Sequence, residues 1–475
     1  MLRIDPQTSR QHLYLRAGFG LSAKQLKVNQ SLQTSTKDIF DQAKPINLLK
    51  VVDENTLTEQ KKDIKEILGK TGEERKSMMK DLRKESKEHI RDLNIAWLNQ
   101  MAGGQASLRE KMTLFWHGHF ACQNVNAFFV QNQNNNLRTM ALGKFSDLLT
   151  SVSKDAAMLA FLNNRQNKKN SPNENFAREV MELFTLGRGN YTEQDVKNAA
   201  RAFTGWNFKP DGSFYFNEKQ HDFDEKTFFG KSGKFTGEDV LAMILEKKET
   251  AYFLTKKIYK YFVNDQAEEK IVASLAEGFF KSDYDIGKLM QQIFMSDWFY
   301  EEKNIGRRIK SPVELLAGLQ QTFGLKFQNP QHPLFVQKSL GQVLFYPPNV
   351  AGWAEGKSWI DSSSLMFRIQ LPELIFKAAV ITTQTKEDGD VNTEFLSKKA
   401  GNSLLVTADW TAYTQQFDTK NEADLLTEIA DYLLQYTLSA KQKTLIMSKA
   451  DKSSRENLIK SMSIAITTLP EYQLC

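Results

Sequence analysis

Residues 173–206 read NENFAREVMELFTLGRGNYTEQDVKNAARAFTGW and predict two helices joined by a glycine-containing turn. The first, residues 173–186, follows a Ser-Pro pair and stops at Gly187, so capping residues precede it and glycine ends it. The second begins at Thr192, where Asp195 completes a predicted N-terminal cap. Helical patterns of this kind recur along the chain. We therefore predict a mostly α-helical, multi-helical globular protein with a short β-hairpin insertion.

The first of these helices carries charged residues beside its apolar positions, namely Glu174, Arg178, Glu179 and Glu182. Arg178 and Glu182 are four residues apart and are therefore predicted neighbours on the helix surface. Glu179 and Glu182 are three apart, so both carboxylates can reach one point, as they do in helical carboxylate metal sites. The alternative is a solvated face with one ion pair, because mixed charge on a helix is commonly exposed to water.

Two histidines lie together at the end of another predicted helix. Ser107 and Glu110 form a predicted capping box, and the helix that they open ends in His117 and His119. Residues two apart do not share a helical face, so these two side chains are expected to point in different directions. We interpret His117 as structural, whereas His119 is open to a structural or a functional role.

A third histidine belongs to the pair His221-Asp222, which follows a predicted β-hairpin over residues 207–222. A histidine followed by an aspartate in a loop suits a metal ligand with its neighbouring acid, or a general base with an orienting carboxylate. It suits a surface turn equally well. Loops held by a rigid scaffold often carry chemistry, which favours this pair over the other histidines.

Three further segments have a distinctive composition. Residues 59–91 are dense in both charges and predict a long amphipathic helix with a solvated face. Residues 251–262 predict a helix whose aromatic stripe we interpret as core. Residues 347–353, PPNVAGW, predict a rigid loop that either lines a pocket or covers the helical core. We predict a main helical domain over residues 1–365 and a C-terminal helical part over residues 366–475 that packs on it.

The composition excludes several classes of protein. The 63 basic residues are spread among 57 acidic ones, so no strong single-sign field for nucleic acid is expected. No stretch approaches the roughly 18 apolar residues of a membrane span. The N-terminus as written lacks the apolar run of a secretory signal. Two cysteines, Cys122 and Cys475, allow at most one disulfide, so the fold is not a disulfide scaffold.

Motifs spread in order over nearly the whole chain carry a family resemblance. They are Arg16-Ala-Gly-Phe-Gly20, Phe115-Trp116 with His119-Phe120, residues 173–187, Ala202-Phe203-Thr204-Gly205-Trp206, His221-Asp222, residues 347–353 and residues 470–475. In these motifs the chain resembles a bacterial domain-of-unknown-function family, number eighteen hundred. The resemblance implies kinship without supplying a reaction.

Some positions match that family's signature and others depart from it. The matching positions are His119, Asn173 or Asn175 with Ala177-Arg178-Glu179, and His221-Asp222. Many relatives have histidine in place of Phe184 and asparagine in place of His117, which argues against either position being an indispensable ligand here. Relatives are often exported, commonly by the twin-arginine route, and often occur beside a sulfatase-like family. The resemblance thus implies a sulfatase-like partner and export, although the chain as written carries no such signal and would be cytoplasmic.

Two classes of function follow from these residues. The first is a metal-dependent enzyme in which His119, Glu179, Glu182 and His221 bind iron, manganese or zinc. Asp222 would support the ligand His221 without binding the metal itself, and Arg178 would orient an anionic group. In this hypothesis Glu179, Arg178, His221 and Asp222 are the catalytic residues. The second is a non-catalytic helical scaffold that docks a secreted or cell-surface partner, with Arg178 and its glutamates as a paired network that fixes the fold.

Overall fold

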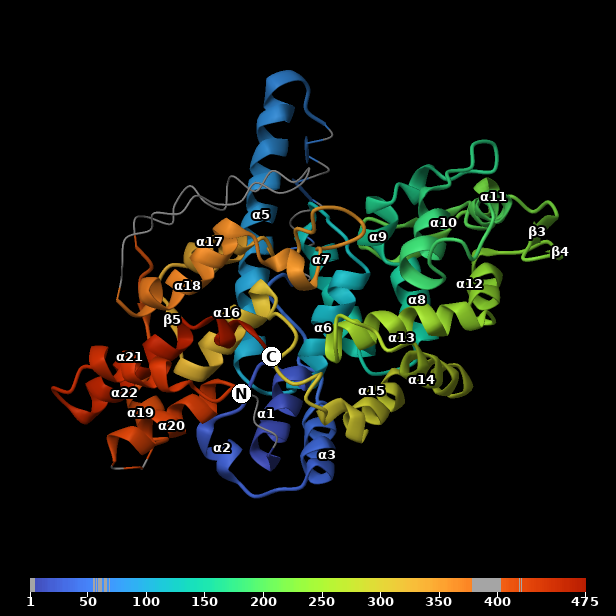
Figure 1. Cartoon of the computed structure of the whole chain (residues 1–475). Helices are drawn as coiled ribbons and strands as arrows, with labels where there is room; N and C mark the ends of the chain where they lie inside the picture. Colours follow the sequence, from blue (N-terminus) through green and yellow to red (C-terminus); the bar gives the residue numbers. More distant parts are fainter. Residues whose placement is uncertain are drawn as a thin grey trace.

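The computed structural model describes residues 5–53, 69–377 and 403–475 except 418 and 420, together with residues 56, 58, 62, 63, 66 and 67. Helices dominate these residues, which confirms the predicted fold class (Figure 1). The first half contains α1 (Pro6–Ala17), α2 (Ala23–Lys27), α3 (Leu32–Gln42), α5 (Gly72–Ala102), α6 (Ser107–His119), α7 (Ala127–Met140), α8 (Phe145–Ser153), α9 (Ala156–Phe161), α10 (Asn175–Glu179) and α11 (Glu193–Ala202). The second half contains α12 (Gly237–Leu245), α13 (Lys248–Phe262), α14 (Glu269–Lys281), α15 (Ile286–Phe294), α16 (Pro312–Phe323), α17 (Gln331–Leu340), α18 (Ser362–Phe376), α19 (Trp410–Thr414), α20 (Glu422–Leu433), α21 (Ala440–Lys449) and α22 (Arg455–Thr467).

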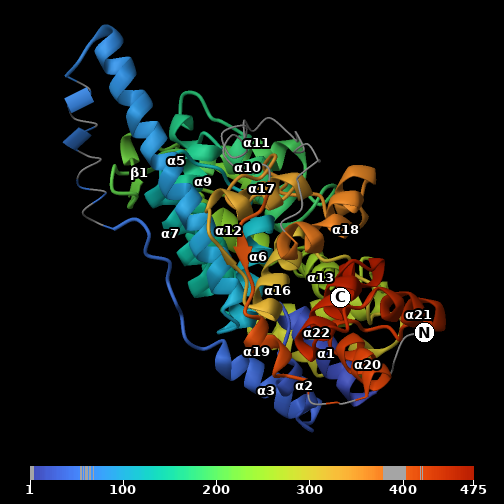
Figure 2. The ribbon, with the colours of Figure 1, turned by 90° about the vertical axis from the view of Figure 1, so that its left-hand side faces the viewer.

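Helix α6 lies in the middle of the molecule and joins two hydrophobic cores (Figure 1). Its Phe115 and Trp116 pack into a core built mainly with α7 to α15, whereas Leu114 packs into a second core built with α5 and α16 to α22. Helix α5 passes beside the second core, and its N-terminal half extends beyond the body of the protein in both views (Figures 1 and 2). The central position of α6 explains why even its charged residues are buried.

The buried charges of α6 are matched by partners on neighbouring helices. The carboxylate of Glu110 accepts hydrogen bonds from Arg138 of α7, at 2.8 and 3.1 Å, and from the Trp97 indole of α5 at 2.8 Å. Lys111 forms a buried ion pair with Glu314 of α16. The predicted capping box at Ser107 is therefore wrong: the helix is preceded by Ala106 in the left-handed region, at φ 51°, with no side-chain cap. Glu110 is used for the interior pair instead.

The predicted β-hairpin is confirmed, and two further small sheets accompany it. Strands β1 (Trp206–Phe208) and β2 (Phe214–Phe216) are antiparallel, with Trp206 opposite Phe216. The other sheets pair β3 (Lys226–Phe228) with β4 (Lys231–Gly233), and β5 (Lys326–Phe327) with β6 (Val406–Thr407). Strands of two or three residues are too short to form a core of their own, so these sheets decorate a helical scaffold.

The predicted division at residues 365 and 366 falls inside α18, and helices on both sides of it contribute to the second hydrophobic core. Residues 378–402 of the predicted C-terminal part lie outside the described residues, and the division stays a prediction. Among the described helices, none combines the length and apolar character that a bilayer crossing requires.

Candidate functional site

The helix that begins with α10 changes its winding where the candidate glutamates lie. After α10 the chain continues through a π-helical turn, Val180–Thr185, which we term the π-turn. The amide groups of Leu186 and Gly187 both donate to Met181 O, at 2.9 and 3.1 Å, and Gly187 then leaves the helix at φ 76°. A π-helical turn within an α-helix is rare and frequently accompanies functional sites. The predicted helix is confirmed apart from its ends, but the sequence pattern gave no sign of the π-turn.

Two side chains from other helices cap the carbonyl end of the π-turn. Nε2 of His119 lies 3.0 Å from Phe184 O, and Nζ of Lys257 on α13 donates to Leu183 O at 3.2 Å. Nζ of Lys257 also lies 3.3 Å from Nδ1 of His119. A carbonyl oxygen only accepts hydrogen bonds, so Nε2 of His119 carries the proton and Nδ1 accepts from Lys257. His119 is therefore a neutral imidazole with both nitrogens engaged.

Burial changes the protonation of both members of this pair. The pKa of His119 falls well below its ordinary value because the imidazole is buried and because the Lys257 ammonium lies beside it. Burial likewise lowers the pKa of Lys257 to about 8, while the carboxylate of Glu355 acts in the opposite direction. At neutral pH the imidazole is uncharged and an appreciable fraction of Lys257 is a free amine.

The pair forms part of the wall of a cavity of about 730 Å³ between α6, α13 and the loop that leads into the turn Gly356–Trp359. The loop approaches α6 closely, since a Cβ on Gly352 would lie 2.4 Å from Gly118 O. The prediction that this loop lines a pocket is confirmed by Trp353, which lies on the cavity wall. The charged lining residues are Lys256, Lys257, Lys260, Arg308 and Lys357 on the basic side, and Asp265 and Glu355 on the acidic side. The cavity is thus aromatic in part and carries an excess of positive charge.

A family model described as a protein of unknown function, DUF1800, matches residues 12–474. The chain belongs to the DUF1800 family. This membership confirms the resemblance inferred from the motifs. No curated protein matches the chain, and no solved structure matches it. The function of this DUF1800 protein therefore has to be inferred from the geometry of its own site.

Of the six residues predicted for the site of this DUF1800 protein, only His119 lines the cavity. Arg178 makes two hydrogen bonds of 2.8 Å to Glu193 of α11 and one of 3.1 Å to Glu174. Glu182 accepts from Arg188 at 2.5 Å and from the Tyr191 hydroxyl at 2.7 Å. The π-turn explains why Arg178 does not pair with Glu182, because a spacing of four no longer stacks residues where hydrogen bonds run from i to i+5. These charges are ion-paired, as in the alternative interpretation of this helix.

Glu179 differs from Glu182 in the direction in which its pKa is shifted. Burial raises its pKa, and the nearby Glu182 carboxylate adds to that effect. Two acids that share a region disfavour each other's charged form. That both carboxylates reach one point stays a prediction, and the Glu182 carboxylate is already bound by Arg188 and Tyr191.

The pair His221-Asp222 locks the hairpin onto α11. Nδ1 of His221 lies 2.8 Å from Thr204 O, and its ring packs edge-on against Phe216 and Phe223 at 5.1 and 4.7 Å. The Asp222 carboxylate accepts from Nε of Arg201 at 2.7 Å. Asp222 is thus held by Arg201, and no hydrogen bond between it and the His221 ring occurs among the described residues. The arrangement is that of a buried structural turn.

The predicted metal ligands do not converge. In the part of the chain that the structure describes, no group of three or more His, Cys, Asp or Glu side chains is placed so that it could hold a metal ion. His119 has both ring nitrogens occupied, and Glu182 is bound to Arg188. His117, which we interpret as structural, accepts a hydrogen bond from the Phe345 amide at 3.1 Å and does not line the cavity. The metal site remains a prediction that this geometry does not favour.

The sequence interpretation missed Lys257, Arg308 and Glu355. Lys257 lies in an aromatic helix that we interpreted as core, and this is correct for most of its residues. The overlooked signal was the pair Lys256-Lys257 inside an otherwise apolar stripe, because a lysine placed toward a core needs a specific partner. Glu355 lies two residues after the PPNVAGW loop, but its position on the same cavity as α13 depends on the tertiary fold.

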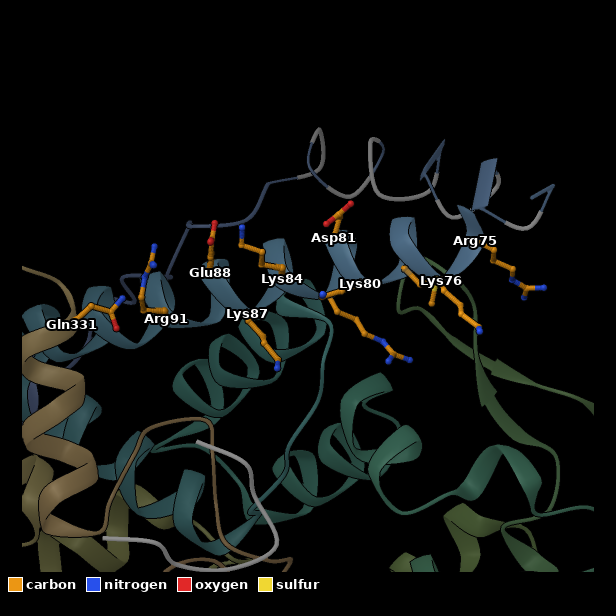
Figure 3. A pocket seen from close by; sticks show the side chains of 11 residues that line it. Arg75, Lys76, Lys80, Asp81, Lys84, Lys87, Glu88, Arg91 and Gln331 are labelled. Atoms are coloured by element: carbon orange, nitrogen blue, oxygen red, sulfur yellow. The ribbon is translucent and has the colours of Figure 1, made fainter. Parts of the chain in front are cut away.

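A second hollow, of about 780 Å³, lies along the outer half of α5 (Figure 3). Its charged lining residues are Arg75, Lys76, Lys80, Asp81, Arg83, Lys84, Lys87, Glu88 and Arg91. All belong to one helix, and Figure 3 shows their side chains spread outward along it. A charged face of a single helix is commonly solvated, as predicted for this segment. The His119 cavity, which combines three segments and buried titratable groups, is the better candidate site.

Proposed function

We propose that this DUF1800 protein is an enzyme that binds a small anionic substrate in the His119 cavity and uses Lys257 for proton transfer. The observation that carries the proposal is the Lys257–His119 contact at the wall of a cavity of about 730 Å³. An acid–base group works best when its pKa lies near the working pH, and the pKa of Lys257 is about 8. Perturbed groups in a cavity are also a general mark of active sites.

The charge of the lining supports an anionic substrate. Five basic side chains face two acidic ones, and of the basic ones Lys256 is paired with Glu269 at 2.6 Å. Arg308 is paired with the buried Glu314, yet its Nε is buried without a hydrogen-bond partner. Arg308 nevertheless lines the cavity, so its side chain adds to the positive charge that a ligand carboxylate or phosphate would meet there. The aromatic rings of Phe115, Phe253 and Trp353 provide the apolar wall that small-molecule sites usually have.

This proposal differs from the metal-dependent hypothesis in using acid–base chemistry at Lys257, because of the four predicted ligands only His119 lines the cavity. The scaffold hypothesis remains the alternative. In that case Lys257 and His119 would serve only to cap the π-turn. A sulfatase-like partner and export stay predictions of the family resemblance.

Isothermal titration calorimetry tests the proposal. Purified protein at low ionic strength is titrated with acetate, succinate, inorganic phosphate and sulfate, and with neutral glycerol and cationic putrescine for comparison. We expect at least one anion to bind once per chain, with an affinity that falls as salt rises because added salt screens the attraction. Lys257→Met should abolish this binding. Lys248→Met, on the same helix but outside the cavity lining, should leave it unchanged.

Two results would contradict the proposal. One is that none of the four anions binds. The other is equal binding by the parent protein and Lys257→Met, provided that circular dichroism shows both to be folded.

A further inference from the structure

The hydrogen bonds of Lys257 leave one direction at its nitrogen without a partner. A neutral primary amine has two N–H groups and one lone pair. Two acceptors face Nζ, namely Leu183 O at 3.2 Å and Nδ1 of His119 at 3.3 Å. His119 is fixed as an acceptor at Nδ1 because Nε2 donates to Phe184 O. When Lys257 is neutral, both N–H groups are thus occupied and the lone pair is left for a ligand in the cavity.

The surroundings raise the fraction of Lys257 that is a neutral amine, and an acidic residue lines the same cavity. Nζ lies 4.9 Å from the centre of the Phe253 ring, and burial moves the pKa of Lys257 to about 8. Desolvation of this kind is how proteins prepare lysine as a nucleophile. Glu355 also lines the cavity, where its carboxyl group can deliver a proton to the leaving oxygen. Arg308 lines the same cavity and supplies positive charge for a carboxylate.

We propose that Lys257 forms an imine with the carbonyl carbon of a small 2-oxo acid bound in the His119 cavity. This inference rests on the proposed function and names its substrate class. The amine lone pair forms the new C–N bond, and the carbonyl π-electrons move to oxygen, which takes up a proton. That first proton comes from the attacking nitrogen, the resulting hydroxyl leaves as water with a second proton delivered by Glu355, and the nitrogen keeps its other hydrogen. Amine, carbonyl compound and the Glu355 carboxylic acid thus give a protonated imine, water and the Glu355 carboxylate, and no oxidant, reductant or further reactant is required.

The positioning of the nitrogen persists after the reaction. A protonated imine keeps one N–H, which can donate to Leu183 O or to His119. The carbonyl end of the π-turn carries partial negative charge, which favours a cationic nitrogen there. His119 is a positioning residue in this step, since it acts on Lys257 rather than on the substrate.

Reductive trapping tests the inference on the full chain. The protein is incubated with pyruvate and sodium cyanoborohydride at pH 7, digested, and mapped by mass spectrometry. Lys256 and Lys260 lie on the same helix and line the same cavity, so they serve as internal comparisons. We expect the reduced adduct at Lys257 to exceed that at either neighbour by about tenfold or more, as a lowered pKa implies. Without cyanoborohydride no stable adduct should remain.

Variants and a second ligand separate this inference from the proposed function. Lys257→Arg keeps the positive charge but should lose the adduct, and Lys248→Arg should keep it. Lactate has the carboxylate of pyruvate without its carbonyl group, and its binding is measured by calorimetry. Lactate binding with equal labelling of the three lysines would overturn the imine and leave the proposed function standing. Absence of a Lys257 adduct, together with no binding of lactate or of the four anions named above, would overturn both.

Discussion

The His119 cavity and the α5 hollow are similar in size and in sign of charge but differ in how their charges are held. Their volumes are about 730 and 780 Å³, and basic residues outnumber acidic ones in both. In the cavity, Lys257 is held by two acceptors and burial shifts its pKa to about 8. Along α5, Lys84 and Glu88 are exposed side chains of one helix. Burial and fixed partners, rather than volume or net charge, separate a reactive site from a solvated surface.

The largest expected difference between the two regions is in stability. Glu314 neutralises Arg308 beside the cavity and Lys111 of α6, and all three are buried. Glu314→Gln leaves two buried cations without their acid and should lower the free energy of unfolding by about 3–5 kcal/mol. The same change at exposed Glu88 should stay within about 0.5 kcal/mol. Urea unfolding measures both, and equal effects would contradict the contrast.

Glycine substitutions next to the cavity distinguish the energetic cost of backbone strain from the cost of a steric clash with a packed side chain. Gly187 and Gly189 both have positive φ, at 76° and 87°. A Cβ on Gly187 would lie 2.8 Å from the Phe253 ring, whereas a Cβ on Gly189 would meet nothing within 4 Å. We expect Gly189→Ala to cost about 1 kcal/mol of strain, and Gly187→Ala to cost about 1–3 kcal/mol more. Similar unfolding midpoints for the two variants would contradict this expectation and would mean that the Phe253 ring shifts to make room for the added methyl group.

The pH dependence of stability should also differ between cavity and surface. The folded-state pKa of His119 lies well below its ordinary value, so below pH 6.5 the unfolded chain takes up a proton that the folded chain does not. Stability therefore falls as pH falls, with a slope of up to about 1.4 kcal/mol per pH unit from this residue. His119→Asn should lessen the slope, measured by urea unfolding at pH 7, 6 and 5. Lys84→Met on the α5 face should leave the slope unchanged. An unaltered slope in His119→Asn would contradict the lowered pKa of His119.

The smallest effect is expected from removing metal ions. Among the residues that the structure describes, no cluster suited to a metal ion is formed, and both His119 nitrogens are engaged within the protein. Dialysis against a chelator should therefore leave the melting temperature of the parent protein unchanged. A lowered melting temperature that recovers with iron, manganese or zinc, together with stoichiometric metal in elemental analysis, would restore the metal-site hypothesis.

Local sequence signals predicted the fold well where the interactions are local. The N-terminal cap predicted at Thr192 and Asp195 is present as a capping box. The β1–β2 hairpin formed as the alternation of aromatic residues indicated. The capping box at Ser107 failed because Glu110 has a stronger partner in Arg138, which lies 28 residues away in the chain. A local capping pattern is therefore formed unless one of its residues is needed as the partner of a buried charge.

The sequence by itself determined the helical fold class and the family, and it named His119 as a candidate site residue. These follow from periodicity, capping and motif order, which need no knowledge of distant contacts. Only the tertiary structure decided that His119 meets Lys257 rather than Glu179 or His221. The π-turn aims two carbonyls at α6 and α13, and the close approach of Gly352 to Gly118 brings the loop with Glu355 to the same cavity. Which polar groups become partners depends on how the helices pack against one another. Packing brings together residues that are far apart in the chain, and no local sequence pattern marks them as partners.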